Sequence, residues 1–266
     1  DRSRDRRHDR SVHRRVGRLE LQASGLGQGT TEAYVAKGAK VAIFDLNAER
    51  AQAVIDELGA DNVAFWSVNV ADEDSVKNAV AEVVEKFGAL HIVNNFAGIG
   101  SAAKTLGKKG VFPLDQWDPV IAINLTGTFN VSRYAAEQMA KNEPINEDGG
   151  RGVIINTASV AGYEGQVGQV AYSATKGGVI GMTVPMARDL ASYGIRVNTI
   201  VPGLIHTPLF EALPEPAYKS LEASVCYPPR LGKPAEIAHL SVFIAENDYL
   251  NAECIRLDGA IRMQPR

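Results

Sequence analysis

The sequence predicts a single-domain α/β fold in which a doubly wound parallel sheet carries helices on both faces. Its 266 residues fit one large domain of this class. The composition, with 45% hydrophobic and 22% charged residues, is that of an ordinary globular protein. Short, continuous apolar runs alternate with longer amphipathic segments along the chain. Parallel strands joined by helical crossovers produce this alternation, because such strands are buried on both sides.

Each expected element can be placed on the chain in order. Six apolar runs are predicted to be strands: residues 40–45, 63–69, 90–95, 152–158, 195–201 and 253–257. The amphipathic segments predict helices near residues 24–37, 47–59, 72–87, 115–140, 170–193 and 234–246. Residues 202–229 contain six of the 12 prolines, which predicts a long ordered loop that frames the substrate.

Charge and composition exclude several classes of function. No stretch approaches the roughly 18 to 20 apolar residues that cross a bilayer, so we expect no membrane insertion. The formal net charge of -3 gives no general attraction to nucleic acid. Cys226 and Cys254 lack metal-ligand spacing and are too few for a disulfide framework. We therefore expect reduced thiols, no metal site, and a reducing compartment such as the bacterial cytoplasm or the mitochondrial matrix.

Residues 1–22 differ in composition from the rest of the chain. They hold eight of the 17 arginines against four acidic residues, a net charge of +4. A nucleic-acid-binding tail would carry interleaved aromatic residues, and a mitochondrial transit peptide would lack the three aspartates. We interpret this segment as a frame-shifted or misassigned stretch in front of a domain at residues 23–266.

A glycine-rich turn, ASGLG, occupies residues 23–27. Its two glycines let the backbone approach a phosphate closely, and the N-terminus of the following helix favours the anion. Asp45 lies 18 residues after Gly27, a spacing suited to hydrogen bonding the adenosine ribose of a dinucleotide. A carboxylate there repels a 2′-phosphate and so favours NAD over NADP. The alternative is a structural turn followed by a capping aspartate.

A dinucleotide-binding fold of the Rossmann type needs an apolar strand directly before this turn. Residues 14–22 read RRVGRLELQ and are too charged for a central strand. We therefore expect no first strand in this chain. We expect the encoded natural sequence to hold an apolar strand there, followed by Thr-Gly-Gly.

A second group of residues can carry acid-base chemistry. Tyr172 and Lys176 are four apart in a helical stretch, which stacks both side chains on one face. A nearby ammonium lowers the pKa of a tyrosine from its reference value near 10, here by an expected shift of about two to three pH units. Tyr172 would then act as a general base or acid, and Ser159, 13 residues earlier, would hold the substrate oxygen. Taken alone, this spacing also arises by chance in structural helices.

These residues follow the order found in the short-chain dehydrogenase/reductase family, which residues 23–266 resemble. The resemblance rests on the glycine turn, Asp45, Asn95-Phe96-Ala97-Gly98, Asn124, Ser159, Tyr172, Lys176 and Pro202-Gly203-x-x-x-Thr207. Within the family, the segments 104–110, 151–178, 187–209 and 255–265 look closest to members that act on 3-hydroxyacyl-CoA.

The resemblance implies a role for each matching residue. Tyr172 would be the catalytic acid/base, Lys176 would lower its pKa and hold the nicotinamide ribose, and Ser159 would orient the substrate oxygen. Asn124 would support a water in a proton relay. The implied cofactor is NAD, and its contacts are Ser24, Gly25, Leu26, Gly27, Asp45, Asn69, Val70, Asn95, Ala97, Gly98, Tyr172, Lys176, Pro202, Gly203, Ile205 and Thr207. The implied substrate contacts are Ser159, Gln169, Tyr172 and His206, and no metal is implied.

Four features depart from the family's pattern. The family turn reads Thr-Gly-x-x-x-Gly-x-Gly, so Glu20 and Leu21 stand where the Thr and the first Gly belong. That change crowds the turn and brings a carboxylate toward the pyrophosphate. Asn69 replaces an aspartate that faces the adenine, His91 replaces one before a strand, and Phe96 widens the Asn-x-Ala-Gly element.

The resemblance implies oxidation of an (S)-3-hydroxyacyl-CoA to a 3-oxoacyl-CoA, with hydride transfer to NAD. Lys104, Lys108 and Lys109 would meet the phosphates of coenzyme A, or else they form a solvated basic loop. Oxidation of hydroxysteroids or secondary alcohols is one alternative, and a non-catalytic scaffold with impaired cofactor binding is an alternative of another class. The resemblance also implies a homotetramer, with helices 115–140 and 170–193 at one interface.

Overall fold

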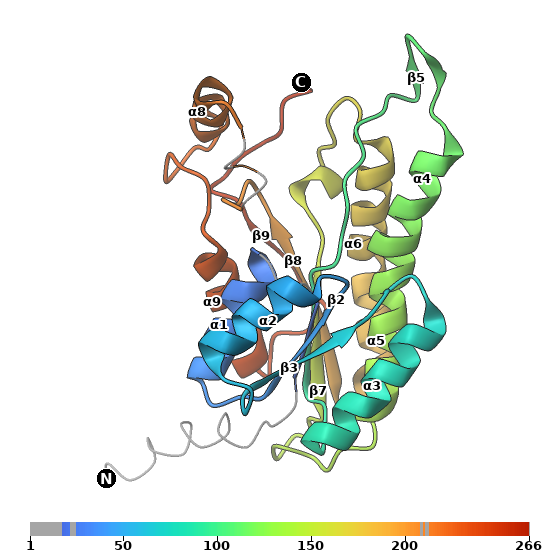
Figure 1. Ribbon diagram of the computed structural model, residues 1–266, viewed down its shortest axis with the longest axis vertical. Helices are drawn as coiled ribbons and strands as arrows, with labels where there is room; N and C mark the ends of the chain where they lie inside the picture. The colour runs from blue at the N-terminus through green and yellow to red at the C-terminus, as the bar shows by residue number, and fades with distance from the viewer. Residues whose placement is uncertain (1–17, 22–24, 208–209, 211–212, 266) are drawn as a thin grey trace.

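The computed structural model describes residues 18–21, 25–207, 210 and 213–265. A seven-stranded parallel sheet runs through it in the order β3-β2-β1-β4-β7-β8-β9 (Figure 1). The order reverses between β1 and β4, the switch point at which such sheets bind ligands beyond the carboxyl ends of their strands. The strands are β1 (Arg18–Leu21), β2 (Val41–Asp45), β3 (Val63–Ser67), β4 (Ile92–Asn95), β7 (Gly152–Thr157), β8 (Ile195–Pro202) and β9 (Cys254–Leu257).

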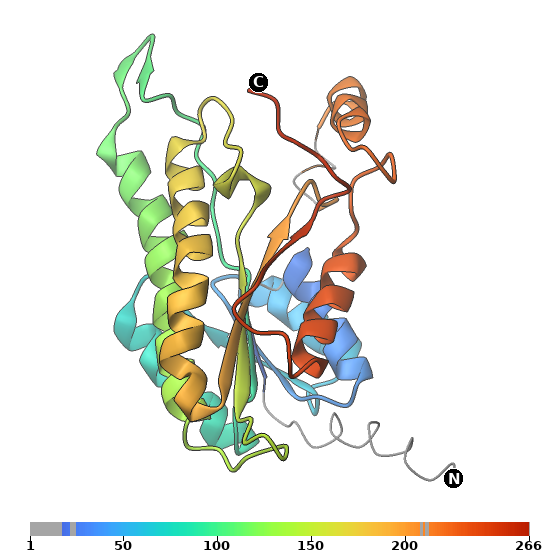
Figure 2. The same ribbon diagram turned by 180° about the vertical axis from the view of Figure 1, so that it is seen from behind.

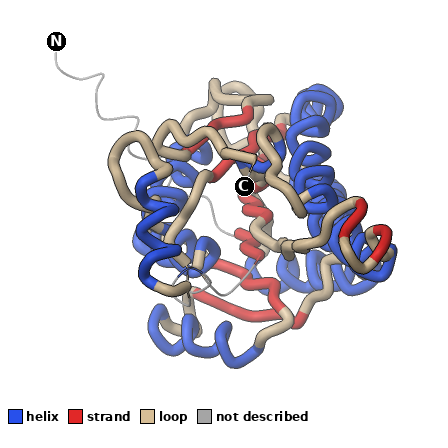
Figure 3. Tube along the Cα trace, turned by 90° about the horizontal axis from the view of Figure 1, so that it is seen from above, coloured by secondary structure: helices blue, strands red, loops and turns tan. Residues whose placement is uncertain are grey.

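Helices cover both faces of the sheet, as the views from behind and from above show (Figures 2 and 3). One face carries α1 (Leu26–Ala36), α2 (Ala48–Leu58) and α9 (Pro234–Glu246). The other carries α3 (Glu73–Phe87), α6 (Val170–Leu190) and a continuous helix made of α4 (Leu114–Val120), the π-helix η3 (Ile121–Gly127) and α5 (Thr128–Met139). Short 3-10 turns lie before and after α6, at η4 (Val160–Gly162) and η5 (Ala191–Tyr193).

Local sequence explains where these helices begin and end. Asn47 precedes α2, and its side chain accepts a hydrogen bond from the Arg50 amide at 2.9 Å. Asp72 caps α3 in the same way, through the Ser75 amide at 2.7 Å. Gly88 then ends α3 in the left-handed conformation at φ 83°, which residues with a Cβ rarely adopt. These caps fix where the crossover helices begin and end, and the carboxyl ends of the strands meet at one edge because the strands are parallel.

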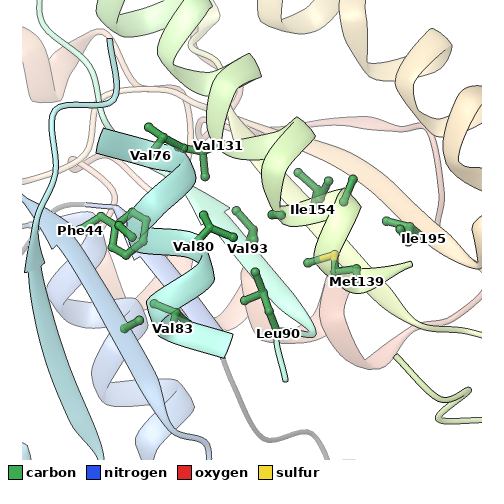
Figure 4. Close-up of a cluster of buried hydrophobic side chains, with 14 of the residues drawn as sticks. Phe44, Val76, Val80, Val83, Leu90, Val93, Val131, Met139, Ile154 and Ile195 are labelled. Atoms are coloured by element: carbon green, nitrogen blue, oxygen red, sulfur yellow. The ribbon is translucent and has the colours of Figure 1, made fainter. Parts of the chain in front are cut away.

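Two apolar cores hold the sheet between its helix layers. One core lies beneath α1, α2 and α9 and includes Tyr34, Ile43 and Ile237. Each fully buried side chain of this size contributes about 1.5–3 kcal/mol to the free energy of folding. Burial on both faces explains why the strands read as continuous apolar runs. The other core lies beneath α3, α5 and α6. Figure 4 shows it, with labels on Phe44, Val76, Val80, Val83, Leu90, Val93, Val131, Met139, Ile154 and Ile195.

The six expected strands and the six expected helical segments are confirmed, with ends that shift by a few residues. The first strand is a correction. β1 forms at Arg18–Leu21 between β2 and β4, with Arg18 beside both Val41 and Ile92. The expectation of no strand within residues 14–22 was wrong, because the two neighbouring strands offer main-chain hydrogen bonds that do not depend on side chains. The frame-shift hypothesis stays a prediction, and residues 1–17 and 22–24 lie outside the described residues.

A second correction concerns residues 202–229, which we expected to be a loop. They contain the helix α8 (Glu215–Ala223), which begins directly after Pro214 and carries an ion pair of 2.6 Å between Glu215 and Lys219. A proline at a helix start does not disturb the hydrogen-bond ladder, so a proline-rich segment can still hold a short helix. The small hairpin β5–β6 (Leu106–Gly107 and Gly110–Val111) stands on the opposite side of the same end of the molecule (Figure 1).

We expect Gly194→Ala to lower the free energy of unfolding by about 3 kcal/mol. Gly194 has φ 70°, and an added Cβ would lie only 2.2 Å from the carbonyl oxygen of Gly149. Gly38→Ala is the matched control, because φ is 78° there but nothing lies within 4 Å of an added Cβ. It should cost about 1 kcal/mol. Urea unfolding of both variants measures the difference, and equal losses would contradict the close approach at Gly194.

Candidate active site

The glycine turn lies at the switch point of the sheet. Gly25 precedes α1 with φ 57°, a left-handed value that glycine adopts without strain. An added Cβ there would lie 3.4 Å from Cγ2 of Thr207, so two predicted cofactor residues from distant parts of the chain meet over this turn. In the described part of the chain, no side chain caps α1 and no acid occupies its first turn. The first turn of α1 therefore offers its amides to a phosphate and carries no acidic side chain. Leu26 and Gly27 begin the helix, whereas Ser24 lies outside the described residues.

Asp45 and two further predicted residues lie at neighbouring strand ends. Asp45 ends β2, and its carboxylate accepts a hydrogen bond from the Asn47 amide at 2.9 Å. Beyond β3, the Val68 amide donates to the Asp45 carbonyl oxygen at 3.1 Å, which ties the two strand ends together. Asn69 accepts from the Ala71 amide at 3.1 Å, and Val70 is buried beside it. The structure thus brings the residues predicted to bind the adenosine to one edge.

Ser159, Tyr172 and Lys176 come together at the carboxyl end of β7. Ser159 opens the turn η4 and accepts a hydrogen bond from the Ala161 amide at 3.2 Å. Ser159 faces Tyr172, which lies in the first turn of α6, and its side chain lowers the pKa of the tyrosine. One turn further along α6, Lys176 is only 4% exposed. Its Nζ donates to the Thr157 carbonyl oxygen at 2.8 Å and lies 5.6 Å from the centre of the Tyr172 ring.

The electrostatics of this group correct one expectation. Burial raises the pKa of Tyr172 above its ordinary value of 10.0, and the hydrogen bond with Ser159 offsets only part of that increase. Burial also lowers the pKa of Lys176 from 10.5 to about 8. We expected the ammonium to lower the pKa of the tyrosine by about two to three pH units. That expectation was wrong, because burial disfavours the charged form of each group and Nζ is bonded to a carbonyl oxygen.

Asn124 lies in the π-helix η3, which interrupts the regular helix at the site. Such π-helical segments occur often at functional sites. Its fully buried side chain accepts from the Ile99 amide and donates to the Ile99 carbonyl oxygen, both at 2.8 Å. It also donates to Thr175 Oγ1 at 3.2 Å. An added Cβ at Gly98 would lie 3.4 Å from Asn124 Oδ1 and 3.6 Å from Lys176 Nζ, so the Gly98 main chain passes close to both.

Asn95 departs from its predicted surroundings. Its side chain is 2% exposed and donates to Asn156 Oδ1 at 2.8 Å and to Ser132 Oγ at 3.1 Å. It therefore joins β4 to β7 and α5 inside the protein. Ala97, two residues further on, is half-buried and packs against the core beneath α3, α5 and α6. Phe96 is buried in the other core, which explains how this larger residue fits the element.

The segment after β8 is held by its neighbours on both sides. The Gly203 amide, directly after Pro202, donates to the Leu257 carbonyl oxygen at 3.0 Å. Ile205 is buried and bridges to Gly232. His206 shares a hydrogen bond of 2.9 Å with the hydroxyl of Tyr218 in α8. Only Thr207 of the predicted residues in this segment reaches the glycine turn.

The predicted substrate residue Gln169 lies directly before α6. Its Oε1 accepts a hydrogen bond from the Gln166 amide at 2.9 Å. It thereby shapes the loop that forms, with residues 103–106, a groove of about 420 Å³. Ser173, next to Tyr172 in the chain, is among the residues that line this groove.

Sequence reasoning missed two residues of this site. Thr157 supplies the carbonyl oxygen that holds Lys176, and Thr175 holds Asn124. The position of Thr157 at the end of an apolar run, two residues before Ser159, was the available signal. Among the described residues, no group of three or more His, Cys, Asp or Glu side chains is placed to bind a metal. No helix within them is long and apolar enough to cross a bilayer.

Comparison with known proteins identifies the class. Residues 22–217 match the family model described as short chain dehydrogenase. The chain belongs to the short-chain dehydrogenase family. It is therefore an oxidoreductase, and the family's cofactor is a nicotinamide dinucleotide.

Individual relatives are similar over nearly the whole chain. The 3-hydroxyacyl-CoA dehydrogenase type-2 of Homo sapiens is 51% identical over 258 residues, which cover 96% of this chain and 98% of that one. The 3-oxoacyl-[acyl-carrier-protein] reductase FabG of Thermotoga maritima is 37% identical over 245 residues, covering 90% and 94%. A crystal structure of 3-hydroxyacyl-CoA dehydrogenase type-2 from Mycobacterium avium gives a TM-score of 0.90 at 41% identity, covering 96% and 99%. These matches confirm the expected resemblance to the type II 3-hydroxyacyl-CoA dehydrogenases.

We expect Lys176→Met to stabilise the cofactor-free protein at pH 7 by about 2 kcal/mol. The unfolded chain binds the lysine proton below its ordinary pKa of 10.5, whereas the folded protein binds it only below about 8. Keeping the charged lysine buried at pH 7 therefore costs about 3 kcal/mol of stability, and the substitution removes this cost. The substitution also loses the hydrogen bond to Thr157, worth about 1 kcal/mol, which leaves a net gain of about 2 kcal/mol.

The gain from Lys176→Met should disappear as the pH rises from 8 toward 10.5, because both states then hold a neutral lysine. Thermal unfolding at pH 7 and at high pH measures it. The exposed Lys86→Met is the control and should show no such pH dependence. A loss of stability at pH 7 would contradict the burial cost.

Proposed function

We propose that this protein is an NAD-dependent dehydrogenase that interconverts 3-hydroxyacyl-CoA and 3-oxoacyl-CoA. The observation that carries the proposal is the grouping of Ser159, Tyr172 and Lys176 at the carboxyl end of β7. The buried Lys176 Nζ is held there by Thr157 at 2.8 Å and lies 5.6 Å from the centre of the Tyr172 ring. The names of the type II relatives support the substrate class.

In the oxidative direction, Ser159 and Tyr172 hold the substrate hydroxyl, and Tyr172 accepts its proton. NAD, when bound, supplies the hydride acceptor. Tyr172 is a phenolate before the proton transfer, and the positive charge of Lys176 stabilises it; accepting the proton turns it into the phenol. Asn124, fixed by Ile99 and Thr175, supports the water that carries the proton onward.

The raised pKa of Tyr172 bears on whether its hydroxyl is ready to donate or to accept a proton. A phenol with a pKa above 10.0 stays protonated at neutral pH and is ready to donate to a 3-oxo group. Oxidation requires the phenolate, whose population increases as the pH rises.

The turn at Gly25 and the side chain of Asp45 fit an NAD molecule. Gly25 takes the positive φ of 57° at the turn into α1, and the amides at the start of that helix can bind a pyrophosphate. Asp45 ends β2 at the neighbouring strand edge, where its carboxylate can accept from the adenosine ribose. The same carboxylate repels the 2′-phosphate of NADP.

The acyl-CoA enters through the groove between residues 103–106 and the loop before α6. Lys104 lines this groove, and Lys108 and Lys109 lie in the turn between β5 and β6. All three carry the charge that coenzyme A phosphates require. His206 shares a hydrogen bond with Tyr218 of α8, and in this proposal it meets the substrate.

The protein acts as a homotetramer in this proposal. A groove of about 500 Å³ between α5 and α6 is lined by Phe129, Met186 and Tyr193, and the rings of Phe129 and Tyr193 are about half exposed. Such an apolar surface on two adjacent helices favours packing against the same surface of a second copy.

The two cysteines support a reducing compartment. Cys226 is exposed and Cys254 is half-buried, and both are free thiols. A bacterial cytoplasm or a mitochondrial matrix would keep them reduced.

We expect Tyr172→Phe to lower kcat by about 10³-fold while NADH binding remains, because the substitution removes only the acid-base hydroxyl. The decrease in NADH absorbance with acetoacetyl-CoA measures turnover, and NADH fluorescence measures binding. Tyr249→Phe, a fully exposed tyrosine, is the control and should retain full activity. Unchanged turnover in Tyr172→Phe would exclude this mechanism, and a folded wild type with neither turnover nor NADH binding would point to the scaffold alternative.

We expect the wild type to prefer NADH to NADPH, and Asp45→Ser to shift that preference toward NADPH about tenfold or more. Removing the carboxylate abolishes its repulsion of the 2′-phosphate and its hydrogen bond to the ribose. The ratio of kcat/KM for the two cofactors is the measurement. Asp61→Ser removes an exposed carboxylate after α2 and should leave the ratio unchanged. An unchanged ratio in Asp45→Ser would remove Asp45 from the cofactor site.

A further inference from the structure

Three buried hydroxyls in the described part of the chain have no hydrogen-bond partner, and one of them belongs to a residue of the candidate active site. Among the described residues, five buried side-chain atoms lack a partner, and two of these belong to Asn95 and Asn156, which are bonded to each other. The other three are the hydroxyl oxygens of Ser101, Thr157 and Ser173. Native proteins pair nearly all of their buried polar groups, so an unpaired one calls for a physical explanation.

Thr157 is the member of this group that touches the catalytic machinery. It is the last residue of β7, and its carbonyl oxygen accepts the hydrogen bond from Lys176 Nζ at 2.8 Å. The residue is 7% exposed, and its Oγ1 has no partner. The main chain of Thr157 therefore holds Lys176, while the Thr157 hydroxyl can still donate and accept hydrogen bonds.

The register of the sheet places that side chain on the face of the glycine turn. Thr157 lies beside Ile200 of β8, and Phe96 follows Asn95, the partner of Asn156 in β4. Both Ile200 and Phe96 belong to the core beneath α1, α2 and α9. Side chains of paired residues share a face of the sheet, so the Thr157 side chain points to the side that carries α1.

We propose that the Thr157 hydroxyl binds the nicotinamide-ribose half of the dinucleotide. This inference rests on the proposed function, since that half of NAD must lie beside Lys176 and Tyr172 for hydride transfer. A threonine occupies staggered χ1 positions, and a single rotation exchanges its hydroxyl and its methyl group. The hydroxyl therefore gains a partner when the cofactor binds, and it has none in the cofactor-free protein.

The experiment uses Thr157→Val, which replaces the hydroxyl by a methyl group of nearly the same size. Because the hydroxyl has no partner in the cofactor-free protein, the variant should unfold at the same temperature as the wild type or a higher one. Its Kd for NADH should rise about five- to tenfold, the loss of one neutral hydrogen bond. Its Kd for ADP, which lacks the nicotinamide ribose, should not change. Thr157→Ser should restore the affinity for NADH.

Thr199→Val is the matched control. Thr199 is also a buried threonine near the end of a central strand, but its Oγ1 bonds Thr183 Oγ1 at 2.7 Å. This variant should unfold at a lower temperature and keep the wild-type Kd for NADH.

Two results would overturn the inference: an unchanged Kd for NADH in Thr157→Val, or a drop in its unfolding temperature like that of Thr199→Val. An equal loss of affinity for ADP would also overturn it, because the effect would then not belong to the nicotinamide half. Failure of the proposed function is distinct, since the wild type itself would then bind no NADH.

Discussion

The bond from the Lys176 ammonium to the Thr157 carbonyl oxygen, 2.8 Å long, is the contact around which the site is arranged. It joins α6 to the carboxyl end of β7. Tyr172, one helical turn before Lys176, is thereby brought to Ser159, two residues beyond Thr157. Because the ammonium is cut off from water, burial lowers its pKa to about 8. The fold thus holds a charge at a cost to stability, in the place where acid-base chemistry needs one.

Glycines permit the close approaches that this arrangement requires. At Gly98 the main chain passes beside Asn124 and Lys176. At Gly127, the last residue of η3, a Cβ would lie 2.6 Å from Cγ2 of Val70, which follows β3. The long helix could not carry Asn124 to the site if a side chain filled that space. The π-helical geometry therefore turns the Asn124 amide inward, and the glycines make room for the helix.

Much of the fold and part of the site followed from the sequence. Buried parallel strands must be apolar throughout, so their runs were readable, and the i, i+4 spacing of Tyr172 and Lys176 placed both on one helix face. β1 was missed because its residues are charged and its place depends on β2 and β4. The helix α8 was missed because prolines dominate its segment. Asn95 matched a motif, yet its side chain lies in the core, since a motif does not state which way a residue faces.

The sequence by itself determined the elements, their order and the class of chemistry, because periodicity, glycines and the Ser159-Tyr172-Lys176 set are local properties of the chain. Only the tertiary structure decided which groups are buried and which atoms meet. The raised pKa of Tyr172 and the lowered pKa of Lys176 come from burial, which packing creates. The meeting of Gly25 with Thr207, and the unpaired hydroxyl of Thr157, arise from segments far apart in the chain. Desolvation and hydrogen-bond pairing depend on neighbours in space, and no local pattern encodes them.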